Sequence, residues 1–392
     1  MIVVVRKPTV MVCGMGALGL YTTIKLANLP GLKIVAGDIN EDYGARGVNL
    51  ARELAHTGGS SYPDVEFVKI DLRDVDGMTK LLEEYRPDIV CQTACTFSWY
   101  MLYQLPPLMK TKLDQQMAWI YHLMVLLPYR LALAMKQAGL IGKIPYVQTS
   151  FPDVGNVVFH NLGMTPTCGV GNTGNVISRI RVGAARRLNE PVRDVEVYAV
   201  FSHNVAINCM AKRTFKGKPC YVKVSLRGED VTERVGLDET WQEMPSIIYG
   251  REGSGLMGGE SAARLIRGLL YDTNDVMHVP GPNGLPGAYP VRVNCRGVEV
   301  VLPKGLTMDE ALRINREGNK LEGVENIGAD GTVTFTDEFN NMTKDILGFD
   351  CKSVKIGEVE DRAKELSSIF RKHLESFKIP VGWVNNTEWI WV

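Results

Sequence analysis

Several features that would assign a function directly are missing from this sequence. Lys+Arg and Asp+Glu both number 44, so no net charge draws the chain to nucleic acid or to an anionic membrane. The 8 cysteines form no Cys-x-x-Cys pair, which argues against a zinc ribbon and a thioredoxin-like site. The 6 histidines also lack the spacing of metal ligands. We therefore expect no metal and no nucleic-acid partner.

A membrane span and a secretory leader are also missing. The longest apolar stretch is Ala118–Met135, and His122, Pro128 and Arg130 interrupt it. It is therefore too polar for a transmembrane helix. The N-terminus runs straight into a predicted strand, without the layout of a signal peptide. Several cysteines lie in apolar, strand-like runs and are expected to be reduced. These observations predict a cytoplasmic protein that does not enter the membrane.

What the sequence does contain is a regular alternation of strand and helix signals through its first 150 residues. The 392 residues suffice for two domains. The alternation predicts a doubly wound parallel sheet of the Rossmann type over residues 1–165, and a change of texture near Pro166 predicts an α+β catalytic domain over residues 166–392. The expected strands of the first domain are Thr9–Cys13, Lys33–Ala36, Val65–Ile70, Asp88–Thr93 and Ile144–Thr149, and its expected helices are Ala17–Leu29, Asn40–Ala55, Val75–Tyr85 and Lys112–Gln137.

The most specific motif is a glycine-rich turn between the first strand and the first helix, which reads Gly14-Met15-Gly16-Ala17-Leu18-Gly19. Glycines at these positions permit a tight turn, close approach of a pyrophosphate and close helix packing. The helix N-terminus adds free N–H groups and partial positive charge. Asp38 ends the second strand 24 residues after Gly14, where its carboxylate would accept both ribose hydroxyls and favour NAD over NADP. We also assign Ile39, Thr93, Ala94 and Ser150 to this NAD site.

One class of NAD enzyme is excluded at this point. Short-chain dehydrogenases move the hydroxyl proton with a Tyr-x-x-x-Lys pair. None of the 14 tyrosines has a lysine four residues later. The chemistry must therefore come from other residues.

A second constellation resembles the lactate/malate dehydrogenase superfamily. Arg179 lies on a predicted helix after the Rossmann domain, and His203 follows it by 24 residues at the end of a strand. In that family an arginine at this spacing grips the substrate carboxylate and the histidine exchanges the hydroxyl proton. A planar guanidinium suits a carboxylate, and an imidazole that titrates near neutrality suits the proton transfer. The resemblance spans roughly residues 9–315.

The same resemblance assigns further residues and reveals departures. Lys110 stands where the family has a basic residue on the loop that closes over substrate, within the aromatic segment Thr96–Lys110. The family pairs its histidine with an aspartate three residues before the arginine, and Val176 occupies that position here. The neighbouring Asn175 is the candidate that orients the ring. Ser150-Phe151 precede a proline where the family has Asn-Pro.

The resemblance implies an NAD-dependent oxidoreductase that interconverts a secondary alcohol and a ketone on a hydroxy acid or a sugar-derived acid. It also implies a homodimer or homotetramer. Two alternatives stay open, because the aspartate partner is missing. One is an epimerase, an isomerase or an opine-type imine reductase on the same scaffold. The other is a sensor that binds NAD without catalysis.

Overall fold

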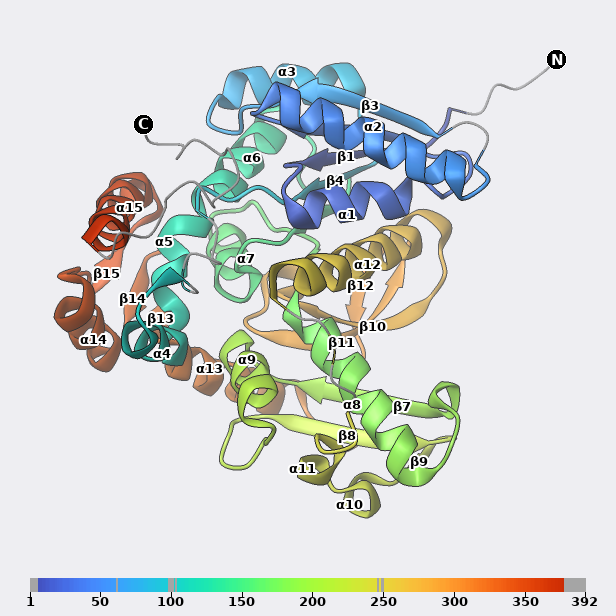
Figure 1. Cartoon of the computed structure of the whole chain (residues 1–392), viewed down its shortest axis with the longest axis vertical. Coiled ribbons are helices and arrows are strands. Elements are labelled where there is room, and N and C mark those ends of the chain that lie inside the picture. Colours follow the sequence, from blue (N-terminus) through green and yellow to red (C-terminus); the bar gives the residue numbers. More distant parts are fainter. Residues whose placement is uncertain are drawn as a thin grey trace.

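The computed structural model describes residues 6–60, 63–97, 102, 104–244, 247 and 250–376. A parallel sheet with helices on both faces forms the N-terminal part of the molecule, and three small antiparallel sheets with further helices follow it (Figure 1). This is the predicted fold class, a doubly wound α/β sheet followed by an α+β region. The division at residue 165 stays a prediction.

The parallel sheet has six strands in the order β3-β2-β1-β4-β5-β6, which is the order of a Rossmann fold. Its central strands are almost wholly buried because helices cover both faces, which is why they read as continuous apolar runs. The strands are β1 (Thr9–Cys13), β2 (Lys33–Asp38), β3 (Asp64–Lys69), β4 (Ile89–Gln92), β5 (Tyr146–Gln148) and β6 (Cys168–Gly169).

The helices of this part begin and end close to the predicted positions, with one exception. The stretch Lys112–Gln137 is not one helix, because the chain leaves helical geometry at Gln116, whose φ is −134° and ψ 99°. The prediction of a single helix was wrong there, since apolar spacing alone does not reveal such a break. The helices are α1 (Ala17–Leu26), α2 (Glu41–Thr57), α3 (Val75–Tyr85), α4 (Pro107–Gln115), α5 (Ile120–Met124), α6 (Leu126–Gln137) and α7 (Pro152–Asn161).

The following part contains two three-stranded antiparallel sheets that a single bridge between Phe201 and Ala288 connects. Helix α12 packs along α1, where Gly259 lies against Tyr21 so closely that a Cβ would meet its side chain at 2.6 Å. The strands are β7 (Val195–Val200), β8 (Tyr221–Leu226), β9 (Glu229–Asp230), β10 (Asp275–Pro280), β11 (Ala288–Asn294) and β12 (Gly297–Val300). The helices are α8 (Asn172–Leu188), α9 (His203–Lys212), α10 (Thr232–Val235), α11 (Leu237–Thr240), α12 (Gly250–Tyr271) and α13 (Met308–Glu322).

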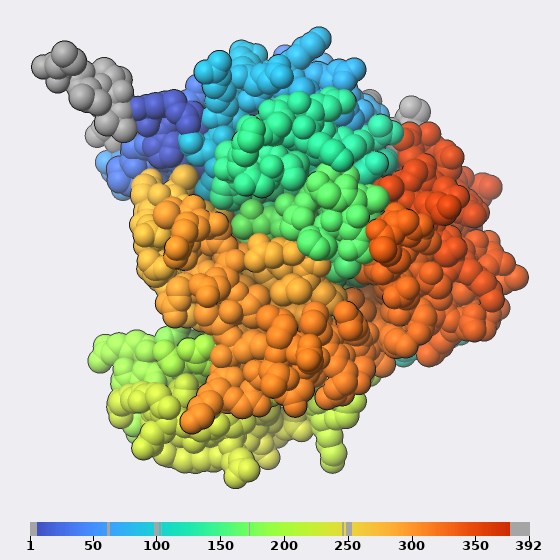
Figure 2. Space-filling model, turned by 180° about the vertical axis from the view of Figure 1, so that it is seen from behind, coloured from blue at the N-terminus to red at the C-terminus, as the bar shows by residue number. Residues whose placement is uncertain are grey.

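The last described residues, 324–376, form a C-terminal module that lies beyond the stretch in which the family resemblance was recognised. It contains a third antiparallel sheet and two helices. Figures 1 and 2 show the module beside the segment that contains α5, α6 and α7, the helices before and after β5. Its elements are β13 (Val324–Ile327), β14 (Val333–Phe335), α14 (Asp337–Leu347), β15 (Ser353–Val354) and α15 (Val359–Ser376).

Aromatic packing fixes the C-terminal module to the N-terminal part. The ring of Phe370 lies 5.3 Å from the ring of Phe97 and 5.3 Å from that of Trp119. All three side chains are at least 95% buried. An ion pair of 2.9 Å between Arg130 and Glu360 joins α6 to α15 at the rim of this contact. The module therefore shares one core with the parallel sheet.

All eight cysteines are unpaired, and Cys13, Cys91 and Cys168 are buried within the sheet. Among the described helices, no single one is long and apolar enough to cross a membrane. The pair Met117–Met124 and Leu126–Gln137 meets both criteria only when the two helices are taken together, and a bend of 43° separates them. Most residues of this pair are buried within the protein.

Because Phe370 is central to the contact, we predict that Phe370→Ala lowers the free energy of unfolding by about 3–5 kcal/mol, the usual cost of such a cavity. Urea unfolding followed by circular dichroism measures it. Leu108→Ala is the matched control, since Leu108 is 72% exposed, and should change stability by less than about 0.5 kcal/mol. Equal effects of the two substitutions would contradict this account of the contact.

Candidate functional site

The glycine-rich turn has the geometry that its sequence predicts. Gly14 adopts φ 114°, and a Cβ there would lie 2.6 Å from the backbone nitrogen of Ala94. A Cβ on Gly19 would lie 1.8 Å from the carbonyl oxygen of Gly14. A Cβ on Gly16, in contrast, would meet nothing within 4 Å. The first and third glycines are thus needed for packing, whereas the second faces open space at the N-terminus of α1.

Asp38 is tied to this turn. Its Oδ2 accepts a hydrogen bond of 2.7 Å from the backbone N–H of Met15, and its Oδ1 accepts one of 2.9 Å from that of Asn40. The carboxylate therefore braces the turn and fixes the end of β2. Ile39, the next residue, lies between these two contacts and is partly exposed.

The residues assigned at the ends of β4 and β5 join the same edge of the sheet. Thr93 Oγ1 donates to the carbonyl of Gly14 at 2.6 Å, and the backbone N–H of Ala94 donates to Cys13 at 3.0 Å. Ser150 Oγ donates to the carbonyl of Ala94 at 3.1 Å. The carboxyl ends of the parallel strands thus bring these predicted residues together, as the fold requires.

His203 is the first residue of α9, and its ring is held by a carboxylate that sequence reasoning did not find. Nδ1 lies 3.0 Å from Oε1 of Glu322, the last residue of α13. The His203 side chain is 16% exposed and that of Glu322 is 1% exposed. Burial alone would lower the pKa of His203. The attraction of Glu322, its hydrogen bond and the attraction of Asp153 outweigh burial and raise that pKa above its ordinary value.

A second buried carboxylate holds the backbone of the same histidine. Oδ1 of Asp153, in the first turn of α7, accepts the backbone N–H of His203 at 3.0 Å. Burial raises the pKa of the Asp153 carboxyl to about 6. The attraction of His203 opposes that rise, and the repulsion from Glu322 adds to it. One buried acid thus contacts the ring of His203 and a second accepts its backbone N–H, an arrangement suited to proton transfer near neutral pH.

Phe151 stands where the resembled family has asparagine. Its ring contacts that of His203 edge to face, with centroids 5.5 Å apart. The residue adopts φ 55° and ψ 54°, the left-handed conformation, at the N-cap of α7. This side of the imidazole is therefore apolar, whereas an asparagine there would present an amide.

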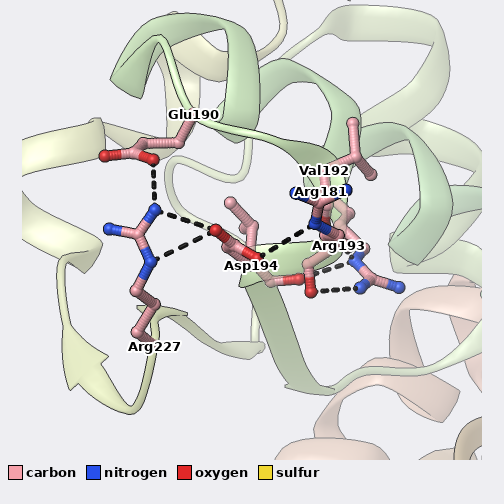
Figure 3. Close-up of polar contacts among 7 residues, drawn as sticks. Arg181, Glu190, Val192, Arg193, Asp194 and Arg227 are labelled. Carbon is pink, nitrogen blue, oxygen red and sulfur yellow. Dashed lines mark hydrogen bonds and ion pairs between the residues drawn. The ribbon is translucent and has the colours of Figure 1, made fainter.

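Helix α8 carries a second arginine, Arg181, two residues after Arg179, and the structure gives the two different contacts. Arg181 Nε donates to the backbone carbonyls of Val195 at 2.6 Å and Val192 at 3.0 Å, so Arg181 ties α8 to the start of β7. Figure 3 shows this contact beside the ion pairs of Arg227 with Glu190 and Asp194. Arg179 Nε, by contrast, is buried and has no hydrogen-bond partner in the part of the chain that the structure describes.

Comparison with known proteins rests on structure, since neither a scan of protein-family models nor a search of curated proteins gave a match. Minor L-lactate dehydrogenase from Enterococcus mundtii in a ligand-bound form is similar, with a TM-score of 0.55, 16% identity and coverage of 81% of this chain and 97% of that one. Lactate dehydrogenase from Eimeria maxima with NADH and oxamate is similar with a TM-score of 0.54 and 16% identity, and the match covers 79% of this chain and 91% of that one. Malate dehydrogenase from Plasmodium falciparum with NADH is similar with a TM-score of 0.50 and 13% identity, and the match covers 93% of this chain and 99% of that one.

The chain has the fold of the lactate and malate dehydrogenases. The predicted resemblance is thus confirmed at the level of the fold. Within this fold the glycine-rich turn lies at the carboxyl end of β1, and His203 begins the helix that follows β7.

Two further residues were predicted for the catalytic site, Lys110 and Asn175. Lys110 forms an ion pair with Asp114, one turn later on α4. Asn175 is buried, and its backbone carbonyl accepts the hydroxyl of Ser178 at 2.9 Å. The carboxylate that the structure places at Nδ1 of His203 is that of Glu322, and the orienting role of Asn175 stays a prediction. Of the aromatic run Phe97–Tyr103, residues 98–101 and 103 lie outside the described residues.

Glu322 was missed because it lies 119 residues from His203 and outside the stretch that resembles the family. One signal was present in the sequence: a glutamate at the end of an amphipathic helix, directly before Gly323. That signal does not distinguish a buried acid from an exposed one. Within the described residues, no cluster of three or more His, Cys, Asp and Glu side chains has the arrangement of a metal site.

We predict that the two arginines differ in their effect on stability. Arg181→Ala should lower the free energy of unfolding by about 1–3 kcal/mol, because it leaves backbone carbonyls without their donor. Arg179→Lys should change it by less than about 0.5 kcal/mol. Thermal and urea unfolding of both variants check this, and a larger loss in Arg179→Lys would give Arg179 the structural role.

Proposed function

We propose that this chain is an NAD-dependent oxidoreductase that interconverts a secondary alcohol and a ketone on a hydroxy acid or a sugar-derived acid. The observation that carries the proposal is the buried pair of His203 and Glu322, at the start of the helix that follows β7. A histidine held by a buried acid is a device for exchanging a proton at its other ring nitrogen. The proposal agrees with the neighbours in fold, which are dehydrogenases.

The residues of the glycine-rich turn fit a dinucleotide. The open space beside Gly16 leaves room for a pyrophosphate, and the first turn of α1 contains no acidic residue that would repel it. Asp38 gives the ribose a carboxylate, and a 2′-phosphate would meet that negative charge. NAD is therefore the cofactor that this site favours, and two of the neighbours were crystallised with NADH.

Arg179 is the residue we assign to the substrate carboxylate. A guanidinium binds a carboxylate through two parallel hydrogen bonds, which fixes the orientation of the substrate as well as its charge. The buried Nε of Arg179 has no partner within the described chain, so this donor is unsatisfied there. Arg181 is excluded from this role, because backbone carbonyls occupy its guanidinium.

His203 is the residue we assign to the proton. NAD bound at the glycine-rich turn and Asp38 would supply the hydride acceptor for the alcohol carbon. In that direction Nε2 of His203 takes the hydroxyl proton, and in the reverse direction it returns a proton to the carbonyl oxygen. Glu322 stabilises the imidazolium that forms, and Phe151 excludes water from one side of the ring.

The redox-neutral and non-catalytic alternatives are separated by turnover. NADH oxidation against a panel of 2-oxo acids and keto sugars detects net reduction. NAD binding without any turnover favours an epimerase, an isomerase, an imine reductase acting on an untested amine, or a sensor. We also propose a cytoplasmic homodimer or homotetramer, and sedimentation equilibrium measures its size.

For the cofactor, we predict tighter binding of NAD than of NADP, and a preference that Asp38→Asn reduces about tenfold or more, the scale of one hydrogen bond to a charged group. Isothermal titration with both nucleotides measures it. Glu41→Gln is the control, since Glu41 lies three residues on and pairs only weakly with Lys69, at 3.5 Å. NADP binding as tight as NAD in the parent protein would contradict the assignment.

For the chemistry, we predict that His203→Asn lowers kcat by about 10²–10⁴-fold, the range expected of a general acid–base residue, while NAD affinity stays within about twofold. Arg179→Lys should act mainly on KM, because the forked donor geometry is lost. Steady-state kinetics with the best substrate of the panel measure both. Wild-type turnover in the His203 variant would refute its role.

A further inference from the structure

The position from which the resembled family orients its histidine is apolar in this chain. Val176 occupies it and is fully buried in the core cluster between α8 and the sheet of β7. A valine offers no hydrogen bond to an imidazole. If His203 acts as proposed above, its protonated form needs a carboxylate from another element.

We infer that Glu322 is the positioning residue for His203, and that its place at the junction of α13 and the C-terminal module makes that module part of the active site. The inference rests on the proposed function for the role of His203. It adds a residue and a structural unit that the family pattern does not supply.

Helix α13 lies unusually close to the beginning of α9. A Cβ on Gly318 would be 2.3 Å from Oγ of Ser202, the residue before His203. Glu322 lies one helical turn beyond Gly318 on the same face, and this close approach brings its carboxylate to Nδ1 of His203. Earlier on this helix, Asn315 Nδ2 donates to the carbonyl of Ala288 at 3.3 Å. Because residue 318 has no side chain, α13 can pack close enough to α9 for the carboxylate of Glu322 to contact His203.

The C-terminal module fixes the other side of Glu322. Gly323 ends α13 with φ 109°, and a Cβ there would lie 2.7 Å from the ring of Phe339. The backbone N–H of Thr336 donates to the carbonyl of Gly323 at 2.9 Å, directly after β14. Phe339 is fully buried in the core that the module shares with the parallel sheet. The glutamate is thus held between the module and α9.

Among the described residues, the charged groups that face His203 are Glu322 on α13 and Asp153 on α7. The second oxygen of Glu322, Oε2, is buried without a hydrogen-bond partner in the described chain, and Oε1 contacts the imidazole. Removal of the Glu322 charge leaves Asp153 as the facing carboxylate within the described residues, and the pKa of Asp153 is itself raised to about 6. The protonated form of His203 then loses most of its stabilisation.

The test is the titration of His203 by NMR in the full-length protein without substrate, with His203→Asn to assign the resonance. Glu322→Gln should lower the pKa of His203 by about one pH unit or more, the effect of removing an opposite charge at this distance. Glu322→Asp should restore part of it. Glu325→Gln is the matched control, because Glu325 is exposed on β13 and pairs with Lys320, and should leave the titration unchanged.

The kinetic readout has a definite sign. Reduction of the ketone requires protonated His203, so activity in that direction falls as pH rises through the pKa of His203. In Glu322→Gln this fall should move to lower pH, and kcat should drop more than KM rises. The alcohol oxidation, which requires the neutral ring, should begin at lower pH.

Gly318→Ala tests the structural part while retaining the carboxylate. The added methyl group must displace α13 from Ser202, so the pKa of His203 should fall here too, by less than in Glu322→Gln. It also serves if Glu322→Gln does not fold. An unchanged titration of His203 in a folded Glu322→Gln or Gly318→Ala protein would overturn the inference. A shifted titration without any dehydrogenase turnover would support the inference and refute the proposed function alone.

Discussion

The cost of burying charge is the constraint on which this site depends. Two carboxylates, Asp153 and Glu322, lie almost wholly inside the protein beside an imidazole, and an unpaired buried ion costs several kcal/mol. The arrangement is tolerable because each acid has a donor on His203, one on the ring and one on the backbone. The arrangement requires that α7, α9 and α13 come together at His203. The close contact between Gly318 of α13 and Ser202 is one of the features that hold them there.

This constraint explains why the C-terminal module belongs with the site. The chain enters the module directly after Glu322, and the module packs on the segment between β4 and α5 through Phe370, whose ring contacts those of Phe97 and Trp119. Asn204, next to His203, donates to the carbonyl of Gln115 at the end of α4. The segment before β5 is thus held from two sides, by α9 and by the module.

Local signals made the half with the parallel sheet predictable from sequence. The turn at Gly14 and the acid at Asp38 are fixed by short-range geometry, and the alternation of strands and helices determines a parallel sheet. His203 and Arg179 were proposed from the 24-residue spacing between them and stay predictions, whereas the backbone contacts of Arg181 are visible only in the folded structure. Glu322 could not be predicted, because its contact joins residues 119 positions apart. The break at Gln116 was missed because the apolar pattern continues through it.

Phe151 combines a left-handed backbone conformation with a ring contact to His203. A bulky side chain in the left-handed conformation costs roughly 1–3 kcal/mol, and asparagine or glycine would relieve most of that strain. The contact of its ring with His203 therefore comes together with a strained backbone. Selection of this protein for heat resistance alone would therefore favour replacement of Phe151, and the variants recovered would trade an apolar wall of the site for a relaxed backbone.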